Sequence, residues 1–80
     1  MTIHVFAPHK TLFSGKATAV SLPGTMGKFT ILEHHAPLVS LLQKGEIYIS
    51  KSDKSNLSLS IVSGFVEVSQ NKVKICIEVN

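Results

Sequence analysis

The strongest constraint on the fold of this chain is an alternation of apolar residues with a period of two along its second half. The alternating apolar positions are Ile47 and Ile49; Leu57, Leu59 and Ile61; Val66 and Val68; and Val73, Ile75, Ile77 and Val79. Successive side chains of a strand point to opposite faces, and strands favour β-branched residues. Each run therefore predicts a β-strand with one apolar face.

Turn-forming residues separate these runs. Lys51 to Asn56 and Gln70-Asn71 each lie between two runs, and Ser63-Gly64 interrupts a third pair. Short strands joined so closely are typical of antiparallel sandwiches or barrels. A chain of 80 residues is long enough for one small domain. We therefore expect a single all-β domain over residues 1–80.

The first half is less regular. The expected strands there contain Ile3 and Val5, ending at Pro8; Thr18 to Leu22, stopped by Pro23-Gly24; and a run that begins at Phe29. The stretch from Ala36 to Lys44 is ambiguous, because Pro37 and the spacing of its leucines are helix signals. A short helix and a strand both remain open for it on periodicity alone.

The charge distribution argues against nucleic-acid binding. The net charge is +3, but the eight lysines are scattered and arginine, the residue best suited to bidentate phosphate and base contacts, is absent. Only 16% of residues are charged and 44% are hydrophobic, which is too apolar for a disordered chain. Few surface charges also suggest that a partner covers part of the surface.

Cys76 is the single cysteine, so no intramolecular disulfide is possible and a reducing compartment is expected. The N-terminus lacks the pattern of a secretory signal. No apolar run approaches the ~20 residues that span a bilayer, so direct membrane insertion is not expected.

No motif for catalysis is found. His34-His35 would point to opposite faces of a strand, and no further ligands stand at zinc-site spacing, so we expect no metal. Cys76 has no signature of a nucleophile and is interpreted as a small apolar filler. The stretch from Gly24 to Lys28 lacks the spacing of a phosphate-binding loop and is interpreted as a turn. The residues alone predict a non-catalytic module without a cofactor, for partner binding or structure.

Three stretches carry a family resemblance. Residues 12–15 read LFSG, residues 22–47 read LPGTMGKFTILEHHAPLVSLLQKGEI, and residues 63–73 read SGFVEVSQNKV. In order and spacing they resemble the epsilon subunit of F-type ATP synthases over essentially the whole chain. The resemblance implies a flattened antiparallel β-sandwich of about ten short strands, with Leu38 to Leu42 as a strand.

The resemblance also implies a function. The family's domain is a non-catalytic part of the central stalk, or rotor, that links the gamma subunit to the ring of c subunits and couples proton transport to ATP synthesis. Its location would be peripheral, on the cytoplasmic face of the bacterial inner membrane. The alternative is a free-standing β-sandwich module that binds a peptide or small ligand.

The resemblance also implies contact residues, by alignment with the family's positions. The c-ring contact aligns with Thr25, Met26, Gly27, Lys28 and Phe29, and the gamma contact aligns with Ala7, His35 and Ser40. Lys28 stands where the family commonly has an acidic residue, so a ring contact and a solvated loop charge are both open for it. Glu33-His34 replaces a common Pro-Gly pair. Typical members continue into two helices, whereas this sequence ends at Asn80, so we expect neither helix-type inhibition nor ATP binding.

Overall fold

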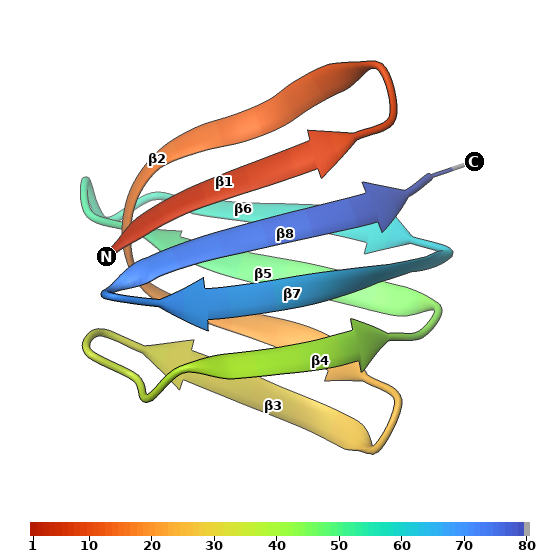
Figure 1. Ribbon diagram of the computed structural model, residues 1–80. Coiled ribbons are helices and arrows are strands. Elements are labelled where there is room, and N and C mark those ends of the chain that lie inside the picture. Colours follow the sequence, from red (N-terminus) through yellow and green to blue (C-terminus); the bar gives the residue numbers. More distant parts are fainter. Residues whose placement is uncertain (80) are drawn as a thin grey trace.

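The structure is a computed structural model that describes residues 1–79, and these residues form an all-β sandwich (Figure 1). The strands are β1 (Thr2–Ala7), β2 (Lys10–Gly24), β3 (Gly27–Leu32), β4 (Leu38–Leu42), β5 (Gly45–Lys51), β6 (Asn56–Ile61), β7 (Ser63–Ser69) and β8 (Lys72–Glu78). The all-β prediction is confirmed. The strands number 8 within the described residues, close to the ten implied by the resemblance.

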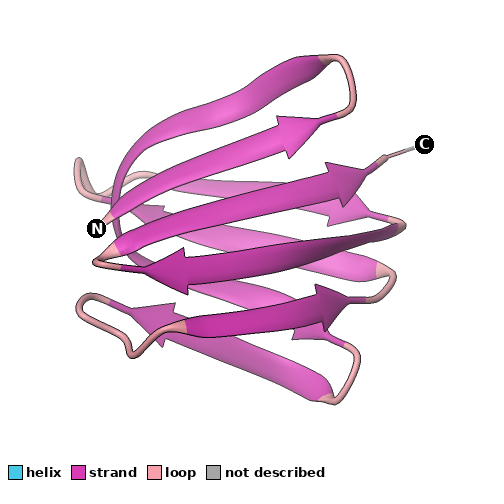
Figure 2. Cartoon of the chain, viewed as in Figure 1, coloured by secondary structure: helices cyan, strands magenta, loops and turns pink. Residues whose placement is uncertain are grey.

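The strands form two layers, and β2 belongs to both. The first half of β2 pairs with β1, and its second half pairs with β3 and β5. The front layer in Figure 1 therefore contains the first half of β2, then β1, β8, β7 and β4. The back layer contains β3, the second half of β2, β5 and β6. Figure 2 shows that short loops join the strands. The pairings are antiparallel except for the parallel pair of β1 and β8.

The ambiguous stretch from Ala36 to Lys44 contains β4 and no helix. Leu38 lies opposite Val68 of β7, and Leu42 lies opposite Gly64. Backbone pairing with β7 therefore overrides the helical spacing of the leucines, because that spacing only reports where apolar residues stand along the chain. The strand implied by the family resemblance is confirmed.

The second strand ends at Pro23-Gly24, as expected, but it includes both residues and begins well before Thr18. β2 begins at Lys10 and runs through Gly24, which lies opposite Gly27 of β3. Proline has no N–H group for a sheet ladder, so it is tolerated only where that side of a strand is unpaired. The pairing of β2 with β5 ends at Ser21, so Pro23 lies where β2 has already left that neighbour.

Both predicted hairpins are confirmed. Gln70 and Asn71 have φ values of 51° and 60° and join β7 to β8. Positive φ at both central residues is the feature of a two-residue hairpin turn, and asparagine adopts it readily. Between β5 and β6, Lys54 has φ of 72°, and the Asp53 carboxylate accepts a hydrogen bond of 2.9 Å from the Ser55 amide.

The core lies between the layers and is apolar, with no buried polar side chain among residues 1–79. Each strand contributes residues at alternate positions, as the period of two predicts. The buried hydrophobic residues are Met1, Ile3, Val5, Ala17, Val20, Leu22, Ile31, Leu42, Ile47, Ile49, Ile61, Val66, Val68, Val73, Ile75 and Ile77. Leu57 and Leu59 are only partly buried, and Val79 lies exposed just after β8.

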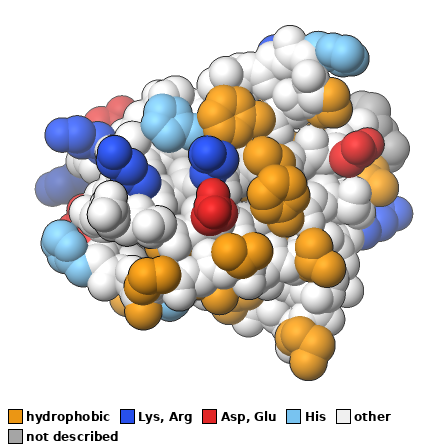
Figure 3. Space-filling view, in the orientation of Figure 1, with side chains coloured by type: hydrophobic (Ala, Val, Ile, Leu, Met, Phe, Trp, Pro, Cys, Tyr) orange, Lys and Arg blue, Asp and Glu red, His pale blue; other side chains and the backbone are white. Residues whose placement is uncertain are grey.

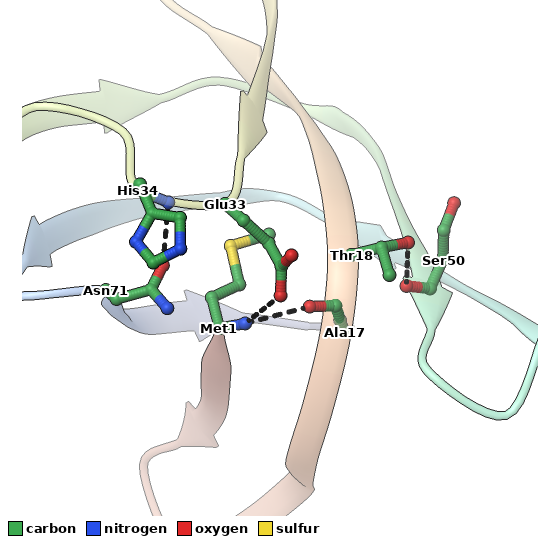
Figure 4. A network of polar contacts seen from close by, with 7 residues as sticks. All are labelled: Met1, Ala17, Thr18, Glu33, His34, Ser50 and Asn71. Carbon is green, nitrogen blue, oxygen red and sulfur yellow. Dashed lines mark hydrogen bonds and ion pairs between the residues drawn. The ribbon is translucent and has the colours of Figure 1, made fainter.

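Polar contacts tie the layers together at the end where β3 and β7 finish (Figure 4). The amino group of Met1 lies 2.7 Å from a carboxylate oxygen of Glu33, which follows β3, and it also donates to the Ala17 carbonyl at 3.1 Å. The His34 amide donates to the Asn71 side-chain oxygen at 2.8 Å. Glu33 and His34, which depart from the Pro-Gly pair of the family, therefore each contact the other layer.

Candidate partner-binding surface

The five predicted ring-contact residues lie together at the turn between β2 and β3. Thr25 donates its backbone N–H to the Leu41 carbonyl at 3.1 Å, which anchors the turn to β4. Met26 follows with 99% of its surface exposed, and Gly27 has φ of 125°, a value that side chains disfavour. Phe29 packs against the core. The turn therefore holds one fully exposed apolar side chain at its tip.

Lys28 has a contact within the chain that neither sequence interpretation included. Its Nζ atom lies 5.2 Å from the centre of the Tyr48 ring, across the outer surface of the back layer. A lysine in this position interacts with the negative face of the ring. Lys28 is exposed, and its charge lies over the Tyr48 ring.

The three predicted gamma-contact residues are not close together. Ala7 ends β1, whereas His35 lies in the loop between β3 and β4, at the opposite end of the sandwich in Figure 1. Ser40 lies on β4 opposite Val66, which places its side chain on the inner side of that edge strand. Of the three, Ala7 alone lines the groove that Thr25 also lines, with β8, β7 and β4 between the two residues.

That groove borders an apolar surface on the front layer. The strand register places Leu41 opposite Phe65, Phe65 opposite Cys76, and Cys76 beside Phe6 of the parallel neighbour. With Val39, which is 70% exposed, these residues form what we call the apolar face: Phe6, Val39, Leu41, Phe65 and Cys76. Figure 3 shows hydrophobic side chains gathered on this side of the molecule.

The groove has a volume of about 520 Å³ and runs along one end of the apolar face. Its walls come from β1, β4, β7 and β8, and from the turn after β2. Cys76 lines the groove and is only partly buried, so it lies on the outer surface and does not fill the core. Apolar clefts of this size are ordinary binding sites for side chains or ligands.

Charged residues lie next to the apolar face, on the same outer surface of the front layer. Glu67 lies opposite Lys74, and Lys74 lies beside His4 in the register of β1 and β8. The His4 ring stacks on Phe6 with centroids 6.1 Å apart, and its Nδ1 atom lies 2.9 Å from the Ser14 hydroxyl. An apolar centre with a polar border is the usual composition of a protein interface.

The outer surface of the back layer differs, and we call it the hydroxyl face: Ser21, Thr30, Tyr48, Ser58 and Ser60. The Ser21 and Thr30 hydroxyls hydrogen-bond at 2.8 Å, and Tyr48 lies opposite both Ser21 and Ser58. Hydrogen bonding and the charge of Glu46 raise the pKa of the Tyr48 hydroxyl above its usual value of 10.0.

The histidine, cysteine and acidic side chains of the described residues do not gather at this surface. Among residues 1–79, no three histidine, cysteine, aspartate or glutamate side chains stand close enough to hold a metal ion. His34 and His35 are both exposed, and the His35 ring lies 2.7 Å from the Ala36 carbonyl. No helical segment within the described range has the length and hydropathy needed to cross a bilayer.

Sequence relatives share one name. "ATP synthase epsilon chain" from Chlorobium limicola is 46% identical over 70 residues, which cover 88% of this chain and 80% of the relative. The protein of that name from Sulfurimonas denitrificans is 38% identical over 78 residues, and this chain spans 60% of it.

Solved structures agree on the fold. A chain from the mitochondrial ATP synthase of Euglena gracilis, solved with OSCP, F1 and the c-ring, superposes with a TM-score of 0.85. It is 16% identical; the match covers 94% of this chain and 48% of that one. A chain from the Tetrahymena thermophila central stalk and c-ring gives a TM-score of 0.81. This second chain is 17% identical, and its similarity, like that of the first, shows the shared fold alone.

A family assignment follows from the sequence match. Residues 1–79 match the family described as "ATP synthase, Delta/Epsilon chain, beta-sandwich domain". This is a subunit family of ATP synthase, which agrees with the expected non-catalytic role and confirms the resemblance. The chain belongs to the epsilon-chain family of ATP synthases, in the form of its β-sandwich domain.

Proposed function

We propose that this chain is the part of an ATP synthase rotor that joins the gamma subunit to the c-ring, and that it thereby couples proton transport to ATP synthesis. It would act at the cytoplasmic surface of a bacterial inner membrane, as a peripheral component. Family membership supports the assignment to the complex. The observation that carries the finer role is the exposed apolar face beside the β2–β3 turn.

The apolar face is the proposed gamma-binding surface. Leu41 and Phe65 are exposed by 65% and 43%, although they lie next to each other across two paired strands. Contiguous apolar side chains on a small domain expose apolar surface to water. A bound partner would bury that surface. Ala7 lies at the end of this face, in the groove, and is the one aligned gamma position that adjoins it.

The β2–β3 turn is the proposed ring contact. Its exposed Met26 side chain lies near the groove, because the neighbouring Thr25 lines it. Methionine is flexible and adapts to apolar surfaces of irregular shape. One apolar face and one apolar turn at its edge would allow two partners to bind at adjoining positions.

The test is binding to the purified gamma subunit of the same complex, measured by size-exclusion chromatography and calorimetry. We expect the unaltered chain to coelute with gamma in a one-to-one complex. Phe65→Ser should weaken binding by tenfold or more, since central aromatic residues often contribute over ~2 kcal/mol. Tyr48→Ser is the matched control, because Tyr48 is an aromatic residue of similar exposure, 46%, on the hydroxyl face.

Thermal unfolding of both variants would show whether they remain folded. Equal loss of gamma binding in the two would refute the assignment of the apolar face. Separate elution of the unaltered chain and gamma at micromolar concentrations would refute the rotor role itself. In that case a peptide bound in the 520 Å³ groove would be the next candidate partner.

A further inference from the structure

The outer edge of β6 is a feature of the back layer that the rotor role leaves unused. β6 pairs with β5 only, so one side of its backbone has no strand beside it within residues 1–79. A free strand edge presents unpaired N–H and C=O groups, which is a template for adding another strand.

The register identifies the residues that present these groups. The Lys51 amide donates to the Ser55 carbonyl at 2.9 Å, so this is a hydrogen-bonded pair of the β5–β6 hairpin. Such pairs alternate along an antiparallel ladder. Residues 57, 59 and 61 therefore bond to β5, and Asn56, Ser58 and Ser60 direct their backbone groups to the open edge. The amide of Val62, the next in this series, bonds to the Glu78 carbonyl at 2.8 Å.

The edge carries none of the usual protections against strand addition. β6 reads NLSLSI, without a charge or a proline, and its pairing with β5 has no bulge. β3, the other end of the back layer, carries Lys28. The front edge strand β4 is partly closed by its bridge to Gly24 and by the hydrogen bond from Thr25 to Leu41. Natural edge strands rely on such devices to avoid pairing.

The sequence of β6 matches a second copy of itself. In an antiparallel pair centred on Ser58, each outward-directed residue meets another: Ser58 lies opposite Ser58, and Asn56 lies opposite Ser60. About six backbone hydrogen bonds would form. Leu57 falls opposite Leu59 on the inner side, and the serines meet on the outer side. Lys54 would lie opposite Val62, so no like charges are paired.

We infer that the edge of β6 is a self-association site, at which a second copy of this chain adds antiparallel about a two-fold axis and extends the back layer. A two-fold pairing of this kind is closed, because each copy uses the same edge and that edge is then covered. The inference is independent of the gamma assignment, since β6 lies in the other layer from the apolar face.

Sedimentation of the purified chain from about 10 μM to about 1 mM covers the range of a small, transient interface. We expect the mass to rise toward that of a dimer and no further. Ser58→Pro should abolish the rise, because proline removes the outward N–H without removing a bond to β5. Ser58→Thr, which keeps the backbone donor, is the control, and circular dichroism would report the fold of each variant.

Register is tested by cysteine crosslinking. Paired Cα atoms at a hydrogen-bonded position stand ~5.5 Å apart, within disulfide range. Ser58→Cys combined with Cys76→Ser should give an oxidised dimer, and Ser60→Cys combined with Cys76→Ser should give at least tenfold less. A constant monomer mass up to 1 mM, undiminished association of Ser58→Pro, or stronger crosslinking at position 60 than at position 58 would each overturn the inference.

Discussion

The two outer faces of the sandwich cover the same core but present different chemistry. On the front layer, Phe65 is open to solvent beside Leu41 and Cys76. On the back layer, Tyr48 is about equally exposed, but Lys28 lies over its ring and serines lie on both sides of it. Polar groups thus surround the exposed ring of the back layer, whereas Phe65 of the front layer has the apolar Leu41 and Cys76 as its cross-strand neighbours. Exposure alone does not identify a binding surface; what surrounds the exposed residue does.

The largest expected effect is on stability, and it tests whether the two layers differ only in their outer faces or also in the packing of the core beneath them. Ile75 lies under the apolar face and Ile49 lies under the hydroxyl face, and both are almost fully buried. Ile75→Ala and Ile49→Ala should each lower the free energy of unfolding by about 2 to 5 kcal/mol, through lost burial and a residual cavity. Urea unfolding would measure this. A markedly smaller loss in one variant would mean that the layers also differ in how well they pack.

A second, smaller effect belongs to the front layer alone. A Cβ atom on Gly64 would clash with the Cys76 carbonyl oxygen and would lie 3.1 Å from the Ile77 Cα, both backbone atoms of β8. Backbone atoms cannot yield as a flexible side chain can, so Gly64→Ala should destabilise the fold by about 1 to 3 kcal/mol. Ser60→Ala, on the exposed hydroxyl face, should change stability by less than about 0.5 kcal/mol. Parallel denaturation curves with equal midpoints would contradict the close approach of β7 and β8.

The sequence predicts the inner surface of this fold better than the outer one. Alternation identifies Ile47, Val66 and Ile75 as core residues, because burial against a common core imposes the same period on every strand. The apolar face is different. Phe6, Leu41, Phe65 and Cys76 come from four strands, and only the register of three pairings makes them neighbours.

The predicted contact residues show the same limit. Thr25 to Phe29 lie together because they are consecutive in the chain. Ala7, His35 and Ser40 were aligned from a family pattern, which contains no distances, and the fold separates them. The sequence interpretation of Cys76 as a small apolar filler rests on its place within a strand, but its position in the alternation puts it on the outer side.

Removing the Lys28 side chain from the Tyr48 ring would make the hydroxyl face more like the apolar face, because an aromatic ring would then be uncovered on each. Lys28→Ala should cost about 0.5 to 1 kcal/mol, the size of an exposed cation–π contact. Lys51 offers a matched comparison, because its Nζ atom lies 5.3 Å from the centre of the Phe13 ring. Lys51→Ala should have a similar effect on urea unfolding. If only Lys51→Ala lowers the free energy of unfolding, the contact between Lys28 and Tyr48 contributes no stability. The interactions within the hydroxyl face are then weaker than their geometry indicates.

The smallest effect concerns the contact that joins the two layers. Glu33 hydrogen-bonds to the amino group of Met1, and this bond and the positive charge lower the pKa of the Glu33 carboxyl below its usual 4.5. A group whose pKa is lower in the folded state stabilises the fold above its unfolded pKa, and that contribution is lost as the pH falls through the folded pKa. Glu33→Gln should therefore be slightly less stable than the unaltered chain at pH 7 and equally stable at the lowest pH.

Asp53 provides the control for that pH dependence. The Ser55 side chain and amide lower the pKa of its carboxyl in the same direction, but within the β5–β6 loop of the back layer. Like Glu33→Gln, Asp53→Asn should therefore be slightly less stable than the unaltered chain at pH 7 and equally stable at the lowest pH. It should not affect the contact between the layers. Hydrogen exchange separates the two cases, because only Glu33→Gln should speed exchange at the Ala17 amide, which bonds to the Met1 carbonyl at 3.0 Å. Unchanged exchange there would mean that the ion pair is too exposed, at 48% for Glu33, to hold the layers together.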